Sequence, residues 1–338
     1  MLTCFNILSD PYPYYLILGT IINPESTIIR QWKRTYMKDN KYARNIFVTG
    51  ILQKDTCSEY QNERHYNDML SVMIPEGIQR GNIDKAMAFF TVAPSIFPKT
   101  KYIAKVDEET YVNMFNIYNI LRFFPKRAPY IIAGWMQHSY INKHTLTMCG
   151  HMILNYNTNY NTCRNTSTFI GPYHYPASGI EILSYRVCES MNSQISLQIS
   201  NYTNRHWESA RQDLILGYIL NSQAFKDKII YINLFPYICD ISHIQQKVTT
   251  LDKAIAINTF NPDLKQMAAL SQKERALNNY LVKRNLRPQF FVKRKEKLIQ
   301  KFKPLIERMP SSILKARKLQ CKTEYNQTIC SYRFIYKV

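Results

Sequence analysis

The chain has 338 residues, of which 46% are hydrophobic and only 9 are glycine. This length and composition fit one large globular domain or two small ones, and they exclude a disordered or collagen-like chain. The formal charge of +20 indicates a partner that carries negative charge, whether a nucleotide, a nucleic acid or an anionic membrane surface.

The first third of the chain alternates between strand and helix patterns. An apolar run from Tyr14 to Ile22 predicts a buried strand, and Ser26 suits the N-cap of a helix that follows it. A second strand is predicted over 45–51. This strand–helix–strand order predicts a parallel, Rossmann-like sheet. Two more helices are predicted over 59–73 and 84–96.

Three consecutive acids, Asp107, Glu108 and Glu109, lie within the most informative stretch, 97–113. They follow a β-rich apolar run over 102–106. Adjacent acids repel one another, so their placement after a buried strand costs free energy unless a cation compensates. Because strands of α/β sheets end at the ligand crevice and hard cations prefer oxygen ligands, the pattern predicts a site for Mg²⁺ or Mn²⁺ with a phosphorylated donor. A solvated acidic turn is the alternative interpretation.

The second half of the globular part contains further helices and strands around one long polar stretch. The polar stretch, 136–168, is predicted to be a loop of the kind that forms substrate lids. The expected elements around it are a helix over 115–124, a strand over 130–134, a core segment over 179–184, helices over 185–191 and 208–220, and a strand over 228–238.

Basic charge is concentrated near the C-terminus, where residues 281–320 hold 13 basic and 2 acidic residues. We therefore divide the chain into a globular domain over 1–248 and a basic, mainly helical C-terminal extension over 249–338. A solvated helical face, an anionic membrane surface and nucleic acid are the alternatives that the basic segment leaves open.

Cysteine and hydropathy patterns bear on the compartment. The 8 cysteines are dispersed without a CxxC pair, which argues against a zinc site. Cys149 with Cys163 and Cys321 with Cys330 are close enough in sequence for local disulfides, with free buried thiols as the alternative. The sequence shows no stretch that reads as a transmembrane helix or signal peptide.

Four segments match, in order and spacing, the motifs of a known enzyme family. They are an Arg-rich helix over 29–36, the acidic stretch over 97–113, a glycine-containing segment over 179–184, and Gln-Asp-Leu-Ile-Leu-Gly over 212–217. Together they resemble the glycosyltransferase family 31 β-1,3-glycosyltransferases, which include galactosyl- and N-acetylglucosaminyltransferases. The sequence looks closest to divergent members from trypanosomatid parasites.

The resemblance implies a GT-A type α/β domain, a Rossmann-like nucleotide-sugar-binding fold, that uses a UDP-sugar and Mn²⁺ or Mg²⁺. It implies inverting transfer of galactose or N-acetylglucosamine, in a β-1,3 linkage, to a glycan or glycoprotein acceptor. Glu109 stands at the family's metal-binding carboxylate, and His243 is a candidate second ligand. Asp213 matches the general base.

Four further residues are implied to bind the donor. Asp107 and Glu108 stand where the family's carboxylates contact the ribose or support the site, and Arg30 and Lys105 are candidate neighbours of the phosphates or uracil. The family's enzymes are type II membrane proteins, so the resemblance implies the lumen of the Golgi or ER, although no anchor is visible in this chain.

Ordinary structural roles compete with several of these assignments. Asp213 could instead stabilise a helix N-terminus, and His243 could be a surface or core histidine. Two motif aspartates are glutamates here, and Gln212 replaces the acid beside Asp213. A catalytically impaired binding protein with a glycosyltransferase fold is therefore one alternative function, and a basic nucleic-acid-binding protein is another.

Overall fold

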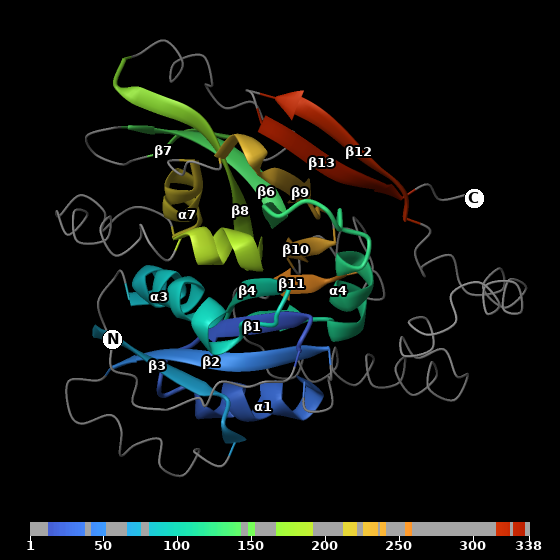
Figure 1. Cartoon of the computed structure of the whole chain (residues 1–338). Helices are drawn as coiled ribbons and strands as arrows, with labels where there is room; N and C mark the ends of the chain where they lie inside the picture. Colours follow the sequence, from blue (N-terminus) through green and yellow to red (C-terminus); the bar gives the residue numbers. More distant parts are fainter. Residues whose placement is uncertain are drawn as a thin grey trace, which may run out of the picture.

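A mixed β-sheet with helices on both faces organises the chain (Figure 1). The computed structural model describes residues 13–37, 42–51, 66–75, 81–142, 148–152, 167–191, 212–221, 226–235, 237–240, 254–258, 316–324 and 327–334. Among these residues no helix is both long enough and apolar enough to cross a bilayer.

The described residues form a 10-stranded sheet in the order β12-β13-β9-β6-β8-β4-β1-β2-β3, with β7 paired to β6. Its strands are β1 (Leu16–Ile21), β2 (Ala43–Ile51), β3 (Met69–Pro75), β4 (Tyr102–Asp107), β6 (Ile131–Asn142), β7 (Met148–Met152), β8 (Phe169–Ser184), β9 (Ile230–Asn233), β12 (Ala316–Glu324) and β13 (Gln327–Phe334). β1 pairs in parallel with β2 and β4, and β8 runs antiparallel to β4. The parallel part is therefore continuous from β4 to β3, as the strand–helix–strand order predicts.

Apolar residues on both faces of the strands explain why helices cover the sheet on both sides. Adjacent residues of a strand point to opposite faces, and Ile17 and Ile103 belong to one core while their neighbours Leu18 and Ala104 belong to another. Strands that are buried on both faces read as continuous apolar runs, which is the pattern of β1 and β4.

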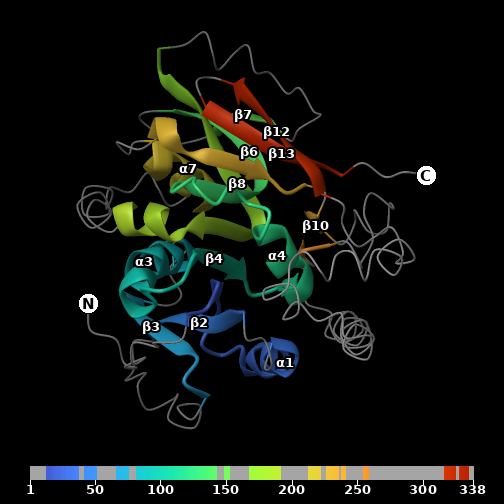
Figure 2. The same cartoon turned by 45° about the vertical axis from the view of Figure 1, so that its right-hand side comes forward.

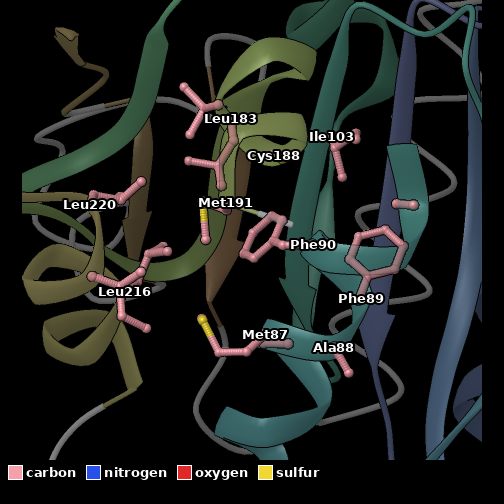
Figure 3. Packing of buried hydrophobic residues seen from close by; sticks show 14 of the residues in the cluster. Met87, Ala88, Phe89, Phe90, Ile103, Leu183, Cys188, Met191, Leu216 and Leu220 are labelled. Carbon is pink, nitrogen blue, oxygen red and sulfur yellow. The ribbon is translucent and has the colours of Figure 1, made fainter. Parts of the chain in front are cut away.

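The first core lies under α3 (Gly81–Ile96), α7 (Gln212–Asn221) and a helix over 185–191. Figure 3 shows Phe90 of α3, Met191 and Leu216 of α7 meeting in this core. Cys188 is buried here as a free thiol, and burial raises its pKa well above the ordinary value. This core joins α7 to the sheet.

The second face is covered by α1 (Thr27–Met37), α4 (Met114–Leu121) and a small three-stranded sheet. Its strands are β5 (Thr110–Val112), β10 (Ile238–Asp240) and β11 (Ala256–Asn258). Figures 1 and 2 place α3 and α4 on opposite sides of β4. The acidic residues at the end of β4 thus lie where the two sheets meet.

Two sequence predictions are wrong within the described residues. The helix expected over 59–73 overlaps β3, which begins at Met69. The loop expected over 136–168 includes the end of β6 and all of β7. Gln137 and Ser139 are buried in β6, so polar residues inside the sheet hid the strand pattern.

Residues beyond 248 contribute strands to both sheets. β11 pairs with β5 and β10, and β13 pairs in parallel with β9. The described part of the predicted extension is therefore strand, where mainly helix was expected, because β13 is rich in β-branched and aromatic residues. Residues 259–315, with most of the basic segment, lie outside the described residues, and the boundary at 248 stays a prediction.

Candidate functional site

The candidate site lies at the carboxyl ends of β1 and β4. In their parallel register Ile21 of β1 is opposite Asp107 of β4, so the loop after β1 and the acidic turn after β4 are neighbours. Ligands of open α/β sheets bind at this edge. β4 is buried until Asp107, whose side chain is 25% exposed.

Lys105 supplies a buried cation directly behind Asp107. Its Nζ lies 2.6 Å from Asp107 Oδ1 and 3.3 Å from Glu181 Oε1. Burial alone would lower the pKa of Lys105, but Asp107 and Glu181 raise it above its ordinary value. Lys105 is therefore a permanently charged ammonium shared by two carboxylates. Its partner Glu181 was not predicted from the sequence.

Glu181 is a carboxylate in the interior of the sheet, 1% exposed and opposite Lys105 in the β4–β8 register. Its Oε2 has no hydrogen-bond partner among the described residues. Burial raises the pKa of Glu181 to about 7; Lys105 lowers it, while Asp213 and Asp107 raise it. The signal in the sequence was a single acid inside the apolar run over 180–183, which a core strand does not tolerate without a partner.

Asp213 comes to the same place from a distant part of the chain. It lies in the first turn of α7, is 6% exposed, and interacts electrostatically with Lys105 and Glu181. One turn further along α7, a Cβ on Gly217 would lie 2.7 Å from Tyr175 Cβ. Only glycine allows this close approach of α7 to β8, and the approach carries Asp213 toward the sheet.

A second buried lysine, from α1, packs against the acidic turn. Lys33 of α1 is fully buried, and its Nζ donates to the backbone carbonyls of Thr110, at 2.8 Å, and Asp107, at 3.3 Å. Burial lowers the pKa of Lys33 to about 8, against the opposing effect of Glu109 and the other acids of the turn. Lys33 and Lys105 are thus two of the cations that three adjacent acids were expected to require.

Arg30 and Glu108, both predicted to bind the donor, contact the β1–α1 loop, residues 22–26. The guanidinium of Arg30 is 2% exposed, and its Nη1 donates to Pro24 O at 2.7 Å. Glu108 accepts from the backbone N–H of Asn23 at 2.9 Å and from the hydroxyl of Ser26. Both side chains therefore support the loop rather than projecting from it.

Metal binding was predicted for Glu109 and His243. Burial and repulsion from Asp107 raise the pKa of Glu109, and a cation would relieve that repulsion. Within the part of the chain that the structure describes, no three His, Cys, Asp or Glu side chains gather as a metal site. Carboxylate oxygens suit a hard cation that takes its other ligands from a diphosphate. His243 lies outside the described residues.

The predicted site residues that the structure describes therefore divide into two groups. Lys105, Asp107 and Asp213 form one electrostatic cluster with Glu181, and Glu109 lies beside it in the acidic turn. Arg30 and Glu108 lie around the adjoining loop.

Carboxylates at the carboxyl end of an α/β sheet suit a domain that binds a phosphorylated ligand through a metal ion. Residues 26–200 match the family model described as galactosyltransferase. The chain therefore belongs to the galactosyltransferase family, and the α/β, GT-A type fold expected from the sequence is confirmed. No curated protein matches the chain.

Solved glycosyltransferases show a distant likeness. A glycosyltransferase involved in glycosylation of the major capsid of PBCV-1 is 12% identical, covering 77% of this chain and 98% of its own, with a TM-score of 0.40. The galactosyltransferase LgtC, in complex with donor and acceptor sugar analogues, is 10% identical, covering 76% and 95%, with a TM-score of 0.43. Mouse xyloside xylosyltransferase 1 is 11% identical, covering 73% and 97%, with a TM-score of 0.33. The family assignment rests on the family model.

Proposed function

We propose that this protein is an inverting glycosyltransferase that transfers galactose or N-acetylglucosamine from a UDP-sugar to a glycan acceptor, in a β-1,3 linkage. The observation that carries the proposal is the meeting of Asp107 and Asp213 around one buried ammonium, Lys105. These residues come from β4 and α7, which are far apart in sequence, and the family of the chain is a transferase family.

In the proposed reaction the acceptor hydroxyl oxygen attacks the anomeric carbon of the donor sugar. The bond from that carbon to the diphosphate oxygen breaks, and UDP leaves with the electron pair. The carboxylate of Asp213 accepts the proton of the hydroxyl as general base. A single displacement from the face opposite the diphosphate inverts the linkage from α to β.

The remaining assignments concern donor binding. Mn²⁺ or Mg²⁺ held by Glu109 and His243 would supply neutralisation of the charge on the diphosphate. Asp107 is the carboxylate at the open end of β4, with Lys105 directly behind it. Contact of Arg30 with the donor stays a prediction, as do the two alternatives for Glu108, contact with the ribose or support of the site. The proposed compartment is the lumen of the Golgi or ER, with membrane association as in the family.

Transfer assays with the purified chain test the proposal. UDP release from UDP-galactose and UDP-N-acetylglucosamine would be measured with a glycan acceptor, with and without Mn²⁺. We expect Asp213→Asn to lower kcat by about 10²-fold or more while UDP binding persists. Glu189→Gln, which changes an exposed acid paired with Arg186, is the control.

Two results would count against the proposal. An unchanged kcat in Asp213→Asn would remove Asp213 as the base. A chain that binds UDP but transfers no sugar from any donor would instead be the catalytically impaired binding protein.

A further inference from the structure

The β1–α1 loop is held by charged side chains from three different elements. Lys85 of α3 donates to Ile22 O at 3.2 Å. Arg30 of α1 donates to Pro24 O, and Glu108 of the acidic turn accepts from the loop at two points. Lys85 and Arg30 are almost fully buried. Loss of the contact from Lys85 or Arg30 would leave part of a buried charged group unsatisfied, which favours the observed conformation of the loop.

Among these three side chains, Glu108 is the one that connects the acidic turn after β4 to the β1–α1 loop. Its Oε2 accepts from Asn23 N at 2.9 Å, and its Oε1 accepts from the Ser26 hydroxyl. The Ser26 carbonyl already accepts the first helical hydrogen bond, from Arg30 N at 3.1 Å. The hydroxyl expected to cap α1 is therefore turned toward Glu108.

Lys33 connects α1 to the acidic turn by a second set of hydrogen bonds. It lies one turn after Arg30 on α1 and donates to the carbonyls of Asp107 and Thr110, on either side of Glu108. The side chain of Lys33 thus contacts the backbone of the acidic turn. The side chain of Glu108 contacts Ser26, directly before α1. The turn is therefore joined by hydrogen bonds both to the loop and to α1.

The length of the side chain at position 108 matters for this connection. A glutamate reaches the Asn23 amide and the Ser26 hydroxyl together, whereas an aspartate is shorter by one C–C bond. A shorter side chain would weaken a direct contact with a donor hydroxyl as well. Only the connecting role predicts that shortening also frees the Asn23 amide, and that loss of the Ser26 hydroxyl weakens donor binding too.

We propose that Glu108 is a positioning residue for donor binding, which holds the β1–α1 loop against the acidic turn so that both walls of the nucleotide site are preformed. The inference rests on the proposed function, because it assumes that the donor binds at this edge. Glu108 then acts on the donor through Asn23 and Ser26 rather than by contact.

The test uses the full chain and three variants: Glu108→Asp, Ser26→Ala and the double variant. UDP binding is measured by calorimetry, KM and kcat by UDP release, and the protection of the Asn23 amide by hydrogen exchange. We expect each single variant to raise the Kd for UDP and the KM by about tenfold, with little change in kcat. The double variant should be no worse than Glu108→Asp alone, because Ser26→Ala removes one of the two contacts that Glu108→Asp already breaks.

Glu189→Asp is the matched control, since it shortens an exposed glutamate that pairs with Arg186 on another part of the surface. It should leave Kd, KM and kcat unchanged. Thermal unfolding of every variant separates a local effect from loss of the fold.

The outcomes are distinguishable. Additive effects in the double variant, or a Glu108→Asp protein with the Kd and KM of the parent chain, would overturn the inference. A parent chain that binds no UDP would refute the proposed function, and with it the donor role of Glu108. Faster exchange of the Asn23 amide in Glu108→Asp would then still establish the connection between turn and loop.

Discussion

Replacement of Glu181 by glutamine tests the electrostatic cluster without any assay of activity. Glu181 faces Lys105 and Asp107 of β4 and Asp213 of α7, while its partner in β6 is the uncharged Gly134. Burial and the two aspartates raise the pKa of Glu181 from 4.5 to about 7. Ionisation of this carboxyl therefore costs more in the folded chain than in the unfolded one.

The sign and size of the effect follow from that shift. Below pH 4.5 Glu181 is protonated in both states, and its contribution to stability is fully present. As the pH rises toward 7 only the folded state keeps the proton, so the free energy of unfolding falls, by about 3 kcal/mol in total above pH 7. Glutamine cannot ionise, so Glu181→Gln should lack this loss.

Denaturant unfolding at pH 4.5, 6, 7 and 8 measures the difference. The free energy of unfolding of Glu181→Gln minus that of the parent chain should increase by about 3 kcal/mol between pH 4.5 and 8. The lost hydrogen bond to Lys105 is a constant offset that cancels in this comparison. Glu189→Gln, in an exposed ion pair, should show no such trend. A difference for Glu181→Gln that is flat with pH would refute the reasoning.

Three further predictions concern stability and covalent state. Lys105→Met leaves the buried Glu181 and the partly exposed Asp107 without their shared cation and should lower the free energy of unfolding by about 3–5 kcal/mol, measured with denaturant; an unchanged value would contradict the assigned ion pairs. A Cβ on Gly19 would lie 2.3–2.5 Å from ring atoms of Phe89, so Gly19→Ala should cost about 1–3 kcal/mol, and an unchanged melting temperature would show that the ring moves freely. Cys321 is opposite Cys330 in the β12–β13 register. Opposite Cα atoms of antiparallel strands are about 4.5–5.5 Å apart, a separation that a disulfide spans. Peptide mapping of the chain after secretion through an oxidising compartment should therefore find the two cysteines linked, and alkylation of both thiols would contradict that expectation.

The sequence alone located the strand that ends in acids. The apolar run over 102–106 ended by three acids predicted a buried strand with a charged end, and β4 has that form. The helix with Asp213 was also predicted, because the acid precedes an apolar run at helical spacing. These features are local, and local patterns determine secondary structure and the face that is buried.

Partners across the sheet could not be predicted in the same way. Glu181 lies 76 residues from Lys105, and nothing in either segment specifies the β4–β8 register that brings them together. The same holds for Glu108, which is 85 residues from Asn23. Its role in supporting a loop depends on the parallel pairing of β1 with β4, which is a property of the folded sheet.

The sequence by itself determined where the acids lie, which strand carries them and which family the chain belongs to. Only the tertiary structure decided what compensates their charge: Lys33 from α1 lies beneath the turn, and Lys105 from β4 is shared with Glu181 of β8. The physical reason is that burial and pairing of charges are set by distances between elements, and those distances exist only once the sheet has formed.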